Sequence, residues 1–250
     1  MFVISGGVGD FLQSLPFVLH NTQESYVISS HHKRCEEFFD YFGIRPKLVI
    51  LYHDYDGWVE SNRCIDALEV PAVPRVTFFN DTHKFPWKPK VFNNEKPVIG
   101  LHLGFSEWSV SNDIVHGYIP KKLHVEIFDI IPKEYNIMVF VTENEYKEFS
   151  DKYPENDSFK YVREPNIVHS LARVSQCDAF IGSDSVFKTM SSMLSIPTIV
   201  LHGDYDDIQR DRNFIDPYID AGCMLVYRFK DFKSELPQIE DFIKQNLETY

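Results

Sequence analysis

Short apolar runs alternate with amphipathic stretches along the first part of the chain. The runs are three to six residues long and rich in β-branched and aromatic residues, as strands are. The stretches between them carry apolar residues at helical spacing. The pattern predicts strands at Phe2–Ile4, Ser25–Ser29, Lys47–Tyr52 and Arg75–Phe79, separated by helices at 9–20, 33–42 and 57–68. Such alternation favours a parallel sheet covered by helices.

Residues 80–97 break this pattern with prolines, asparagines and lysines, which is typical of a linker. A second alternating series follows. It predicts strands at Val98–His102, Asn136–Thr142, Lys160–Val162, Ala179–Ile181, Thr198–Leu201 and Met224–Tyr227, with helices at 120–131, 143–152, 166–175, 185–195 and 236–247. We therefore expect an α/β protein with two Rossmann-like parallel-sheet domains, a small one at 1–92 and a larger one at 93–234, facing a central cleft. For the terminal helix, within 235–250, packing back on the N-terminal domain is an open alternative.

One strand-to-helix turn in the second half is rich in small polar residues. The buried run Ala179–Ile181 leads through Gly182, Ser183, Asp184 and Ser185 into the helix at 185–195. The N-terminus of a helix presents unpaired backbone N–H groups and the positive end of a dipole, so it favours an anion, most often a phosphate. The alternative is an ordinary N-cap formed by Asp184 or Ser185.

The N-terminus of the chain repeats this arrangement. The strand Phe2–Ile4 runs through a turn with Gly6, Gly7 and Gly9 into a helix that begins at Asp10. The spacing differs from G-x-G-x-x-G, so a dinucleotide cofactor is disfavoured. Asp10 either caps the helix or faces the carboxyl edge of the sheet, where open α/β folds bind ligands.

Composition narrows the class of protein further. The chain has 250 residues, 44% of them apolar, and contains no run long enough to cross a bilayer; Met1 leads directly into a strand, so a cytoplasmic protein is expected. The four cysteines lack C-x-x-C spacing, which indicates neither a zinc site nor a disulfide framework. A formal charge of −12 disfavours nonspecific nucleic-acid binding but leaves room for a local basic groove.

Four segments carry motifs that are informative together. They are residues 9–16, Gly-Asp-Phe-Leu-Gln-Ser-Leu-Pro, residues 97–104, Pro-Val-Ile-Gly-Leu-His-Leu-Gly, residues 183–185, Ser-Asp-Ser, and residues 196–198, Ile-Pro-Thr. In their order and spacing they resemble the ADP-heptose:lipopolysaccharide heptosyltransferase family, whose two-domain arrangement is the GT-B glycosyltransferase fold. The first is similar to that family's Gly-Asp, apolar pair and Leu-Pro signature, and the second to its first C-terminal strand and loop. The last two resemble its Asp-Ser/Thr-Gly phosphate loop and its Val-Pro-Thr strand.

The resemblance implies an inverting, metal-independent glycosyltransferase that needs no cofactor. It makes residues 1–92 the acceptor side, with Asp10 as the catalytic base, and residues 93–234 the domain that binds a nucleotide-diphosphate sugar. The donor-binding residues that we expect are Gly7, Gly9, His102, Gly104, Thr142, Glu143 (or Glu145), Ile167, Ser183, Asp184, Ser185, Val186, Lys188 and Thr189. Three positions depart from the family pattern: Val186 replaces a glycine, Thr189 replaces a histidine, and residues 116–120, His-Gly-Tyr-Ile-Pro, lack a lysine.

Several alternatives remain open from the sequence. The acceptor could be a glycan, a lipid-linked sugar or modified DNA. A phage- or virus-type enzyme that glycosylates a hydroxymethylated pyrimidine would need a basic, aromatic strip, and one is present at Arg75, Phe78, Phe79, His83, Lys84, Phe85, Trp87, Lys88 and Lys90. A sugar-nucleotide epimerase and a non-catalytic nucleotide-binding protein are further candidates. Asp204, Asp206 and Asp207 follow a glycine turn and are interpreted as loop carboxylates, not as metal ligands.

Overall fold

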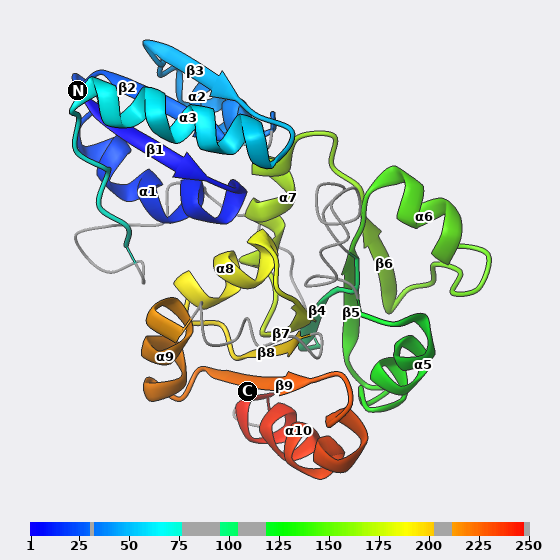
Figure 1. Ribbon diagram of the computed structural model, residues 1–250. Coiled ribbons are helices and arrows are strands. Elements are labelled where there is room, and N and C mark those ends of the chain that lie inside the picture. Colours follow the sequence, from blue (N-terminus) through cyan, green and yellow to red (C-terminus); the bar gives the residue numbers. More distant parts are fainter. Residues whose placement is uncertain (31–32, 77–95, 105–118, 203–211, 248–250) are drawn as a thin grey trace. The chain divides into compact units, whose positions relative to one another are not determined.

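The computed structural model describes residues 1–30, 33–76, 96–104, 119–202 and 212–247. The chain divides into two compact units, one formed by Met1–Pro86 with Asn166–Val168 and the other by Trp87–Pro165 with His169–Tyr250 (Figure 1). The predicted domain boundary at residue 92 and most of the predicted linker lie outside the described residues. Each unit is an α/β structure with its own parallel sheet.

The first unit is built on three parallel strands in the order β1-β2-β3. Its elements are β1 (Phe2–Gly6), α1 (Val8–His20), β2 (Tyr26–Ser30), α2 (Cys35–Phe42), β3 (Leu48–Leu51) and α3 (Tyr55–Leu68). The central strand β2 is buried along its whole length, as expected for a strand with neighbours on both sides. β3 is the edge strand opposite β1, and its Leu48 is 44% exposed.

A further segment lies on the other side of β1. Ala72 pairs with Val3 in a parallel bridge, and the backbone N–H of Val73 donates to the carbonyl of Val3 at 2.8 Å. Of the predicted strand at Arg75–Phe79, the structure describes Arg75 and Val76, and neither lies in a strand; residues 77–79 lie outside the described residues. The chain thus pairs β1 with β2 on one side and with the 71–73 segment on the other.

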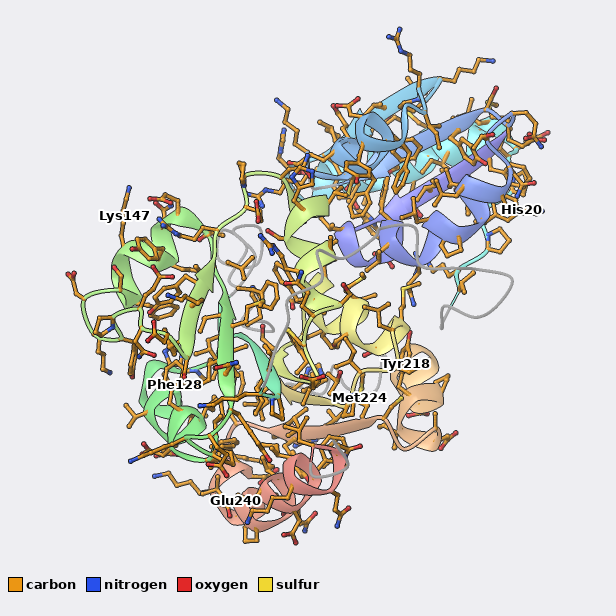
Figure 2. The ribbon with its side chains drawn as sticks, turned by 180° about the vertical axis from the view of Figure 1, so that it is seen from behind. His20, Phe128, Lys147, Tyr218, Met224 and Glu240 are labelled. Carbon is orange, nitrogen blue, oxygen red and sulfur yellow. The ribbon has the colours of Figure 1, made fainter. Side chains whose placement is uncertain are left out.

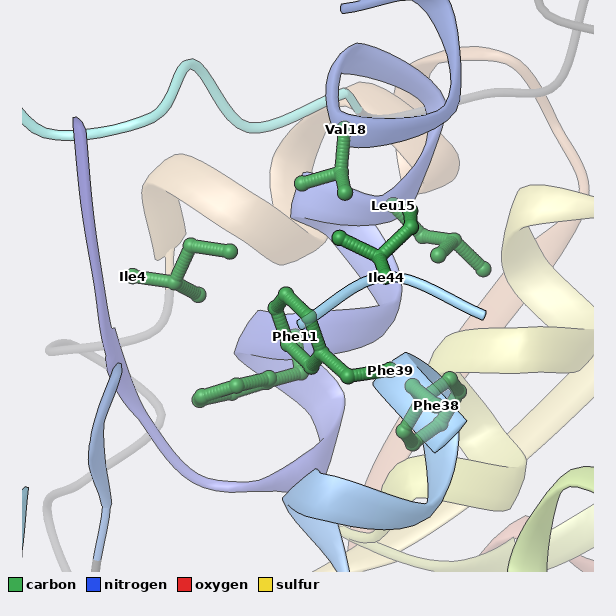
Figure 3. Close-up of a pocket in the computed structure, with 7 residues that line it drawn as sticks. All are labelled: Ile4, Phe11, Leu15, Val18, Phe38, Phe39 and Ile44. Carbon is green, nitrogen blue, oxygen red and sulfur yellow. The ribbon is translucent and has the colours of Figure 1, made fainter. Parts of the chain in front are cut away.

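The core of the first unit contains a small apolar cavity (Figure 3). It lies between β1, α1, α2 and the loop that follows α2, and it is lined by Ile4, Phe11, Leu15, Val18, Phe38, Phe39 and Ile44. The rings of Phe11 and Phe39 meet edge to face, with centroids 6.1 Å apart. Because only apolar side chains line it, this cavity offers no polar group that could orient a nucleotide or a sugar.

The second unit has six parallel strands in the order β6-β5-β4-β7-β8-β9. Its elements are β4 (Val98–His102), α5 (Lys121–Asp129), β5 (Asn136–Phe140), α6 (Glu143–Phe149), β6 (Phe159–Val162), α7 (Ile167–Val174), β7 (Ala179–Ser183), α8 (Val186–Met193), β8 (Thr198–His202), α9 (Arg212–Asp220), β9 (Met224–Arg228) and α10 (Phe232–Leu247). The strand order is that of the Rossmann fold, as the sequence predicted.

Helices α5 and α10 supply much of one side of the second unit's core. Ile99 and Leu101 of β4 pack in a single cluster with residues of both helices, including Leu123, Ile239 and Ile243. The terminal helix, for which packing on the first half was an open alternative, therefore contributes its buried side chains to the second unit's core. Tyr218 of α9 and Met224 of β9, both labelled in Figure 2, are also buried.

The other face of this sheet carries aromatic rings and explains one glycine. Phe180 of β7 packs near Phe140 of β5, which in turn contacts Phe187 of α8 at a ring-centroid distance of 5.0 Å. A Cβ atom at Gly100 would come within 2.7 Å of the Phe180 ring and 2.8 Å of the Cys177 sulfur. Gly100 therefore allows the Phe180 ring and the Cys177 sulfur to lie directly on β4. Among the described residues, no helix is long and apolar enough to cross a bilayer.

Candidate functional site

The polar residues of the second unit gather where the strand order reverses. The chain builds β4, β5 and β6 to one side and then returns to add β7, β8 and β9 on the other, so the carboxyl ends of β4 and β7 form the topological switch point. Ligands of open α/β sheets bind in the crevice outside the strands at this point. His102 ends β4, Gly104 follows it, and Ser183 ends β7.

The turn after β7 presents the N-terminus of α8. Ser185 is the N-cap residue, with extended backbone angles (φ −154°, ψ 171°), and its hydroxyl accepts a hydrogen bond from the N–H of Lys188 at 3.5 Å. Asp184, Ser185 and Val186 are half-buried. The amides at the very start of a helix have no acceptor inside the helix, and here they lie at a partly exposed turn. The N-cap that the sequence left as an alternative is present, and it falls on Ser185.

Asp184 and Lys188 form an ion pair one helical turn apart. The ammonium nitrogen of Lys188 lies 2.5 Å from Oδ1 of Asp184, and Lys188 is only 3% exposed. A lysine in this position is not a solvated helix residue. Because Asp184 stands at the N-terminus of α8, the Lys188 charge offsets a carboxylate that would otherwise repel an arriving anion.

Two of the expected donor-binding hydroxyls are used inside the protein. The Ser183 hydroxyl is fully buried and donates to the carbonyl oxygen of Gly104 at 2.9 Å, which joins the loops after β7 and β4. The Thr189 hydroxyl donates to the Ser185 carbonyl in its own helix at 3.3 Å. Both residues shape the turn, and their hydroxyl protons are committed to backbone oxygens.

His102 is buried and packs against α8. Its ring packs on Phe187, with centroids 4.7 Å apart, and its Nδ1 atom is buried and makes no hydrogen bond within the described structure. Burial lowers the pKa of His102 below the ordinary value for histidine, and the nearby charge of Glu145 offsets only part of that effect. His102 is therefore a neutral imidazole at the switch point.

Thr142 and Glu145 form a capping box at the start of α6. The N–H of Thr142 donates to Oε2 of Glu145 at 2.6 Å, and the N–H of Glu145 donates back to the Thr142 hydroxyl at 3.3 Å. The other carboxylate oxygen of Glu145 is buried, has no hydrogen bond to a described residue, and lies over Gly104, where a Cβ atom would collide with it. Glu145, which the sequence gave only as an alternative to Glu143, thus approaches the switch point.

The remaining predicted donor residues lie elsewhere. Glu143 is exposed and pairs with Arg163 at 3.6 Å, and Ile167 is a buried residue at the start of α7. Gly7 and Gly9 belong to the first unit, as the N-cap and an early residue of α1. The basic strip beyond Arg75 and the Asp204, Asp206 and Asp207 cluster lie outside the described residues. Within the described part of the chain, no group of three or more His, Cys, Asp or Glu side chains could hold a metal ion.

In the first unit, Asp10 sits beside the carboxyl end of β1. Its Oδ2 atom accepts a hydrogen bond from the N–H of Gly7 at 2.7 Å, so it caps α1 as one of the two sequence interpretations expected. Its Oδ1 atom lies 2.8 Å from a guanidinium nitrogen of Arg75. Gly6, with φ +118°, passes so close that a Cβ atom there would collide with the Asp10 carboxylate. Asp10 remains 31% exposed, so the cap does not remove it from solvent.

Other polar groups surround Asp10 at the same edge of the sheet. Ser30 ends β2, and its hydroxyl donates to the Gly6 carbonyl at 2.8 Å. Tyr52 follows β3, and burial together with the Asp10 charge raises its pKa above the ordinary value for tyrosine. Burial raises the pKa of the Cys35 thiol to about 12, and Asp10 contributes in the same direction. Sequence reasoning missed Ser30 and Tyr52; their positions at strand ends were the available signal.

Comparison with known proteins identifies this arrangement of elements. No protein family model and no curated protein sequence matches the chain. Solved structures do: the E. coli ADP-heptose lps heptosyltransferase II is 12% identical with a TM-score of 0.58, over 100% of this chain and 99% of that one. The glycosyl transferase family 9 protein from Veillonella parvula is 11% identical with a TM-score of 0.55, over 100% and 98%. E. coli heptosyltransferase WaaC with ADP-2-deoxy-2-fluoro heptose is 10% identical with a TM-score of 0.54, over 98% and 100%.

The chain therefore has the fold of the GT-B glycosyltransferases. Within that class it is similar to heptosyltransferases and to glycosyl transferase family 9 over its full length. The resemblance that the sequence motifs indicated is confirmed at the level of the fold.

Proposed function

We propose that this protein is a glycosyltransferase that moves a sugar from a nucleotide-diphosphate sugar to a hydroxyl acceptor. The observation that carries the proposal is the placement of the half-exposed α8 N-terminus at the switch point of a sheet whose fold is that of glycosyltransferases. WaaC is described with an ADP-sugar analogue, so an ADP-sugar is the first donor to test.

In the proposed reaction, a single displacement inverts the configuration at the sugar's anomeric carbon. Asp10 takes the proton of the acceptor hydroxyl as its oxygen attacks that carbon, a role that typically contributes about 10²–10⁴-fold. The bond to the diphosphate breaks, and the diphosphate leaves with the electron pair. The amides at the α8 N-terminus then stabilise its charge without a metal or a cofactor, while Lys188 neutralises Asp184.

The test begins with donor binding. Thermal shift is measured with UDP-, ADP-, GDP- and CMP-sugars; a ligand at about 100 times its Kd stabilises the folded protein by about 2.7 kcal/mol, which is readily detected. The donor that binds is then used in transfer assays against glycan, lipid-linked sugar and hydroxymethylated DNA acceptors.

Asp10→Asn separates the proposed base from the helix cap. An asparagine oxygen can still accept from the Gly7 N–H, so we expect folding and donor binding to persist while transfer falls at least 100-fold. Asp54→Asn is the matched control, because Asp54 caps α3 in the same unit by accepting from the Gly57 N–H at 2.7 Å. Transfer at the normal rate by Asp10→Asn would show that Asp10 is not the base.

The same assays distinguish the alternatives. Conversion of the donor sugar without any acceptor would indicate an epimerase. Binding of a nucleotide diphosphate without turnover across the panel would indicate a non-catalytic nucleotide-binding protein. Transfer restricted to DNA would indicate the base-modifying enzyme.

A further inference from the structure

Backbone hydrogen bonds hold Arg75 at the carboxyl end of β1, where the chain of the first unit crosses from β3 to the other side of β1. This crossing is the switch point of the first unit. The chain crosses from β3 to the other side of β1, where the 71–73 segment pairs with Val3. The backbone on both sides of Arg75 is fixed: the N–H of Val73 donates to the Val3 carbonyl at 2.8 Å, and the N–H of Val76 donates to the Gln13 carbonyl of α1 at 2.9 Å. Arg75 is thus held over the carboxyl end of β1, although its side chain is 52% exposed.

The guanidinium of Arg75 uses both of its terminal nitrogens. One lies 2.8 Å from Oδ1 of Asp10, and the other donates to the carbonyl oxygen of Ser5 at 3.2 Å. The other carboxylate oxygen of Asp10, Oδ2, accepts a hydrogen bond from the Gly7 N–H. Gly6 lies so close to the same carboxylate that a side chain at position 6 would collide with it. Gly6, Gly7 and Arg75 therefore fix the orientation of the carboxylate, and Arg75 is the neighbour that contacts Oδ1.

We propose that Arg75 is the positioning residue for Asp10. This inference rests on the proposed function, in which Asp10 accepts the proton of the acceptor hydroxyl. Because Oδ2 is committed to the N–H of Gly7, Oδ1 is the atom that receives the proton. Arg75 holds Oδ1 in place with one hydrogen bond, and the second lone pair of the same oxygen stays available to the acceptor hydroxyl. A misplacement of about 1 Å at a reacting group costs about 100-fold in rate, so the orientation matters.

The competing explanation is a surface ion pair, since exposed pairs contribute little to stability and many have no measurable role. Kinetic measurements on Arg75 variants distinguish a positioning role from a surface ion pair. For Arg75→Gln we expect kcat to fall about 100-fold, with the donor Kd and the acceptor KM within about threefold of wild type. Arg75→Lys keeps the charge but cannot bridge Asp10 and Ser5 together, so we expect kcat to recover to within about tenfold of wild type.

Arg63→Gln is the matched control. Arg63 is an exposed arginine of α3 in the same unit and pairs with Glu60 at 3.5 Å. We expect this variant to match wild type in kcat, KM and donor binding. A fall in kcat in Arg63→Gln as large as that in Arg75→Gln would overturn the specific role of Arg75.

A second measurement does not depend on activity. The amide resonance of Gly7 reports the hydrogen bond to Asp10, and Asp10→Ala gives its position when that bond is absent. We expect Arg75→Gln to move the Gly7 resonance toward the Asp10→Ala position, and Arg63→Gln to leave it unchanged. An Arg75→Gln protein with an unmoved Gly7 resonance and a normal kcat would overturn the inference.

The two measurements also separate failure of the inference from failure of the proposed function. If Asp10→Asn transfers sugar normally while Arg75→Gln moves the Gly7 resonance, Asp10 is not the base, yet Arg75 does position it. If Asp10→Asn abolishes transfer and Arg75→Gln is normal in kcat, the base assignment stands and the positioning role is wrong.

Discussion

Two side chains at the second unit's switch point show how burial sets chemistry. His102 at the end of β4 and Lys188 in α8 are both buried ionisable residues, and Lys188 forms a close ion pair with Asp184. For His102, burial lowers the pKa by more than the nearby charge of Glu145 raises it, and the ring packs on Phe187. A close countercharge therefore keeps one buried group charged, while burial favours the neutral form of the other.

The lowered pKa of His102 predicts a pH dependence of stability. A histidine that stays neutral in the folded protein contributes stability above its unfolded pKa of about 6.5, and this contribution is lost as the pH falls, because the unfolded chain binds the proton first. We expect the free energy of unfolding to fall less between pH 7 and pH 5 in His102→Gln than in wild type, by at most about 2 kcal/mol. Urea denaturation at the two pH values measures this difference.

His169→Gln is the control for that experiment, since His169 is an exposed histidine of α7. It should keep the pH dependence of the wild type. An equal loss of pH dependence in both variants would contradict the assignment to His102.

The predicted helices match those of the structure closely. The bounds of α1, α2, α3, α5, α6, α7, α8 and α10 differ from the predicted ranges by at most four residues at either end. Helix α9 was not predicted; it contains Pro217, and proline is disfavoured inside a helix. The pairing of Ala72 with β1 was not predicted either, because a single bridge leaves no periodic pattern to detect.

The ion pair at the start of α8 predicts unequal effects of its two partners. Asp184→Asn removes a carboxylate from an ammonium that is 3% exposed, and breaking a buried pair in this way typically costs about 3–5 kcal/mol. Lys188→Met should cost less, because the carboxylate of Asp184 is partly exposed and can be hydrated.

Chemical denaturation of both variants and of Asp184→Asn/Lys188→Met completes a double-mutant cycle. We expect the double variant to be more stable than Asp184→Asn alone. Simple additivity of the two single effects would show that the pair is not coupled.

Taken over both units, the sequence predicted the architecture and the general place of the site, but not its contacts. Strand ends and Gly-rich turns are local patterns, so Asp10, His102 and Ser185 could be found from them. The pairing of Asp10 with Arg75 joins residues far apart in the chain, and the approach of Glu145 to Gly104 depends on how α6 packs. Neither leaves a local signal in the sequence.

The net charge of −12 leads to a prediction about the DNA alternative. Nonspecific DNA affinity comes mostly from phosphate neutralisation, and an acidic protein has little of it. We expect no measurable binding to a short duplex by fluorescence anisotropy at about 150 mM salt, a concentration at which nonspecific affinities are already weak. Salt-dependent binding that is lost in Lys84→Ala/Lys88→Ala/Lys90→Ala would contradict this and favour the DNA-modifying enzyme.

The outer strand of the first unit has an implication for how the protein behaves when concentrated. β3 consists of leucine, valine, isoleucine and leucine, with neither a charge nor a proline, and no other strand among the described residues pairs with its outer edge. Natural proteins commonly protect such edges, because a second copy can extend the sheet there and begin aggregation. A lysine in place of the exposed Leu48 would supply the protection that this strand lacks.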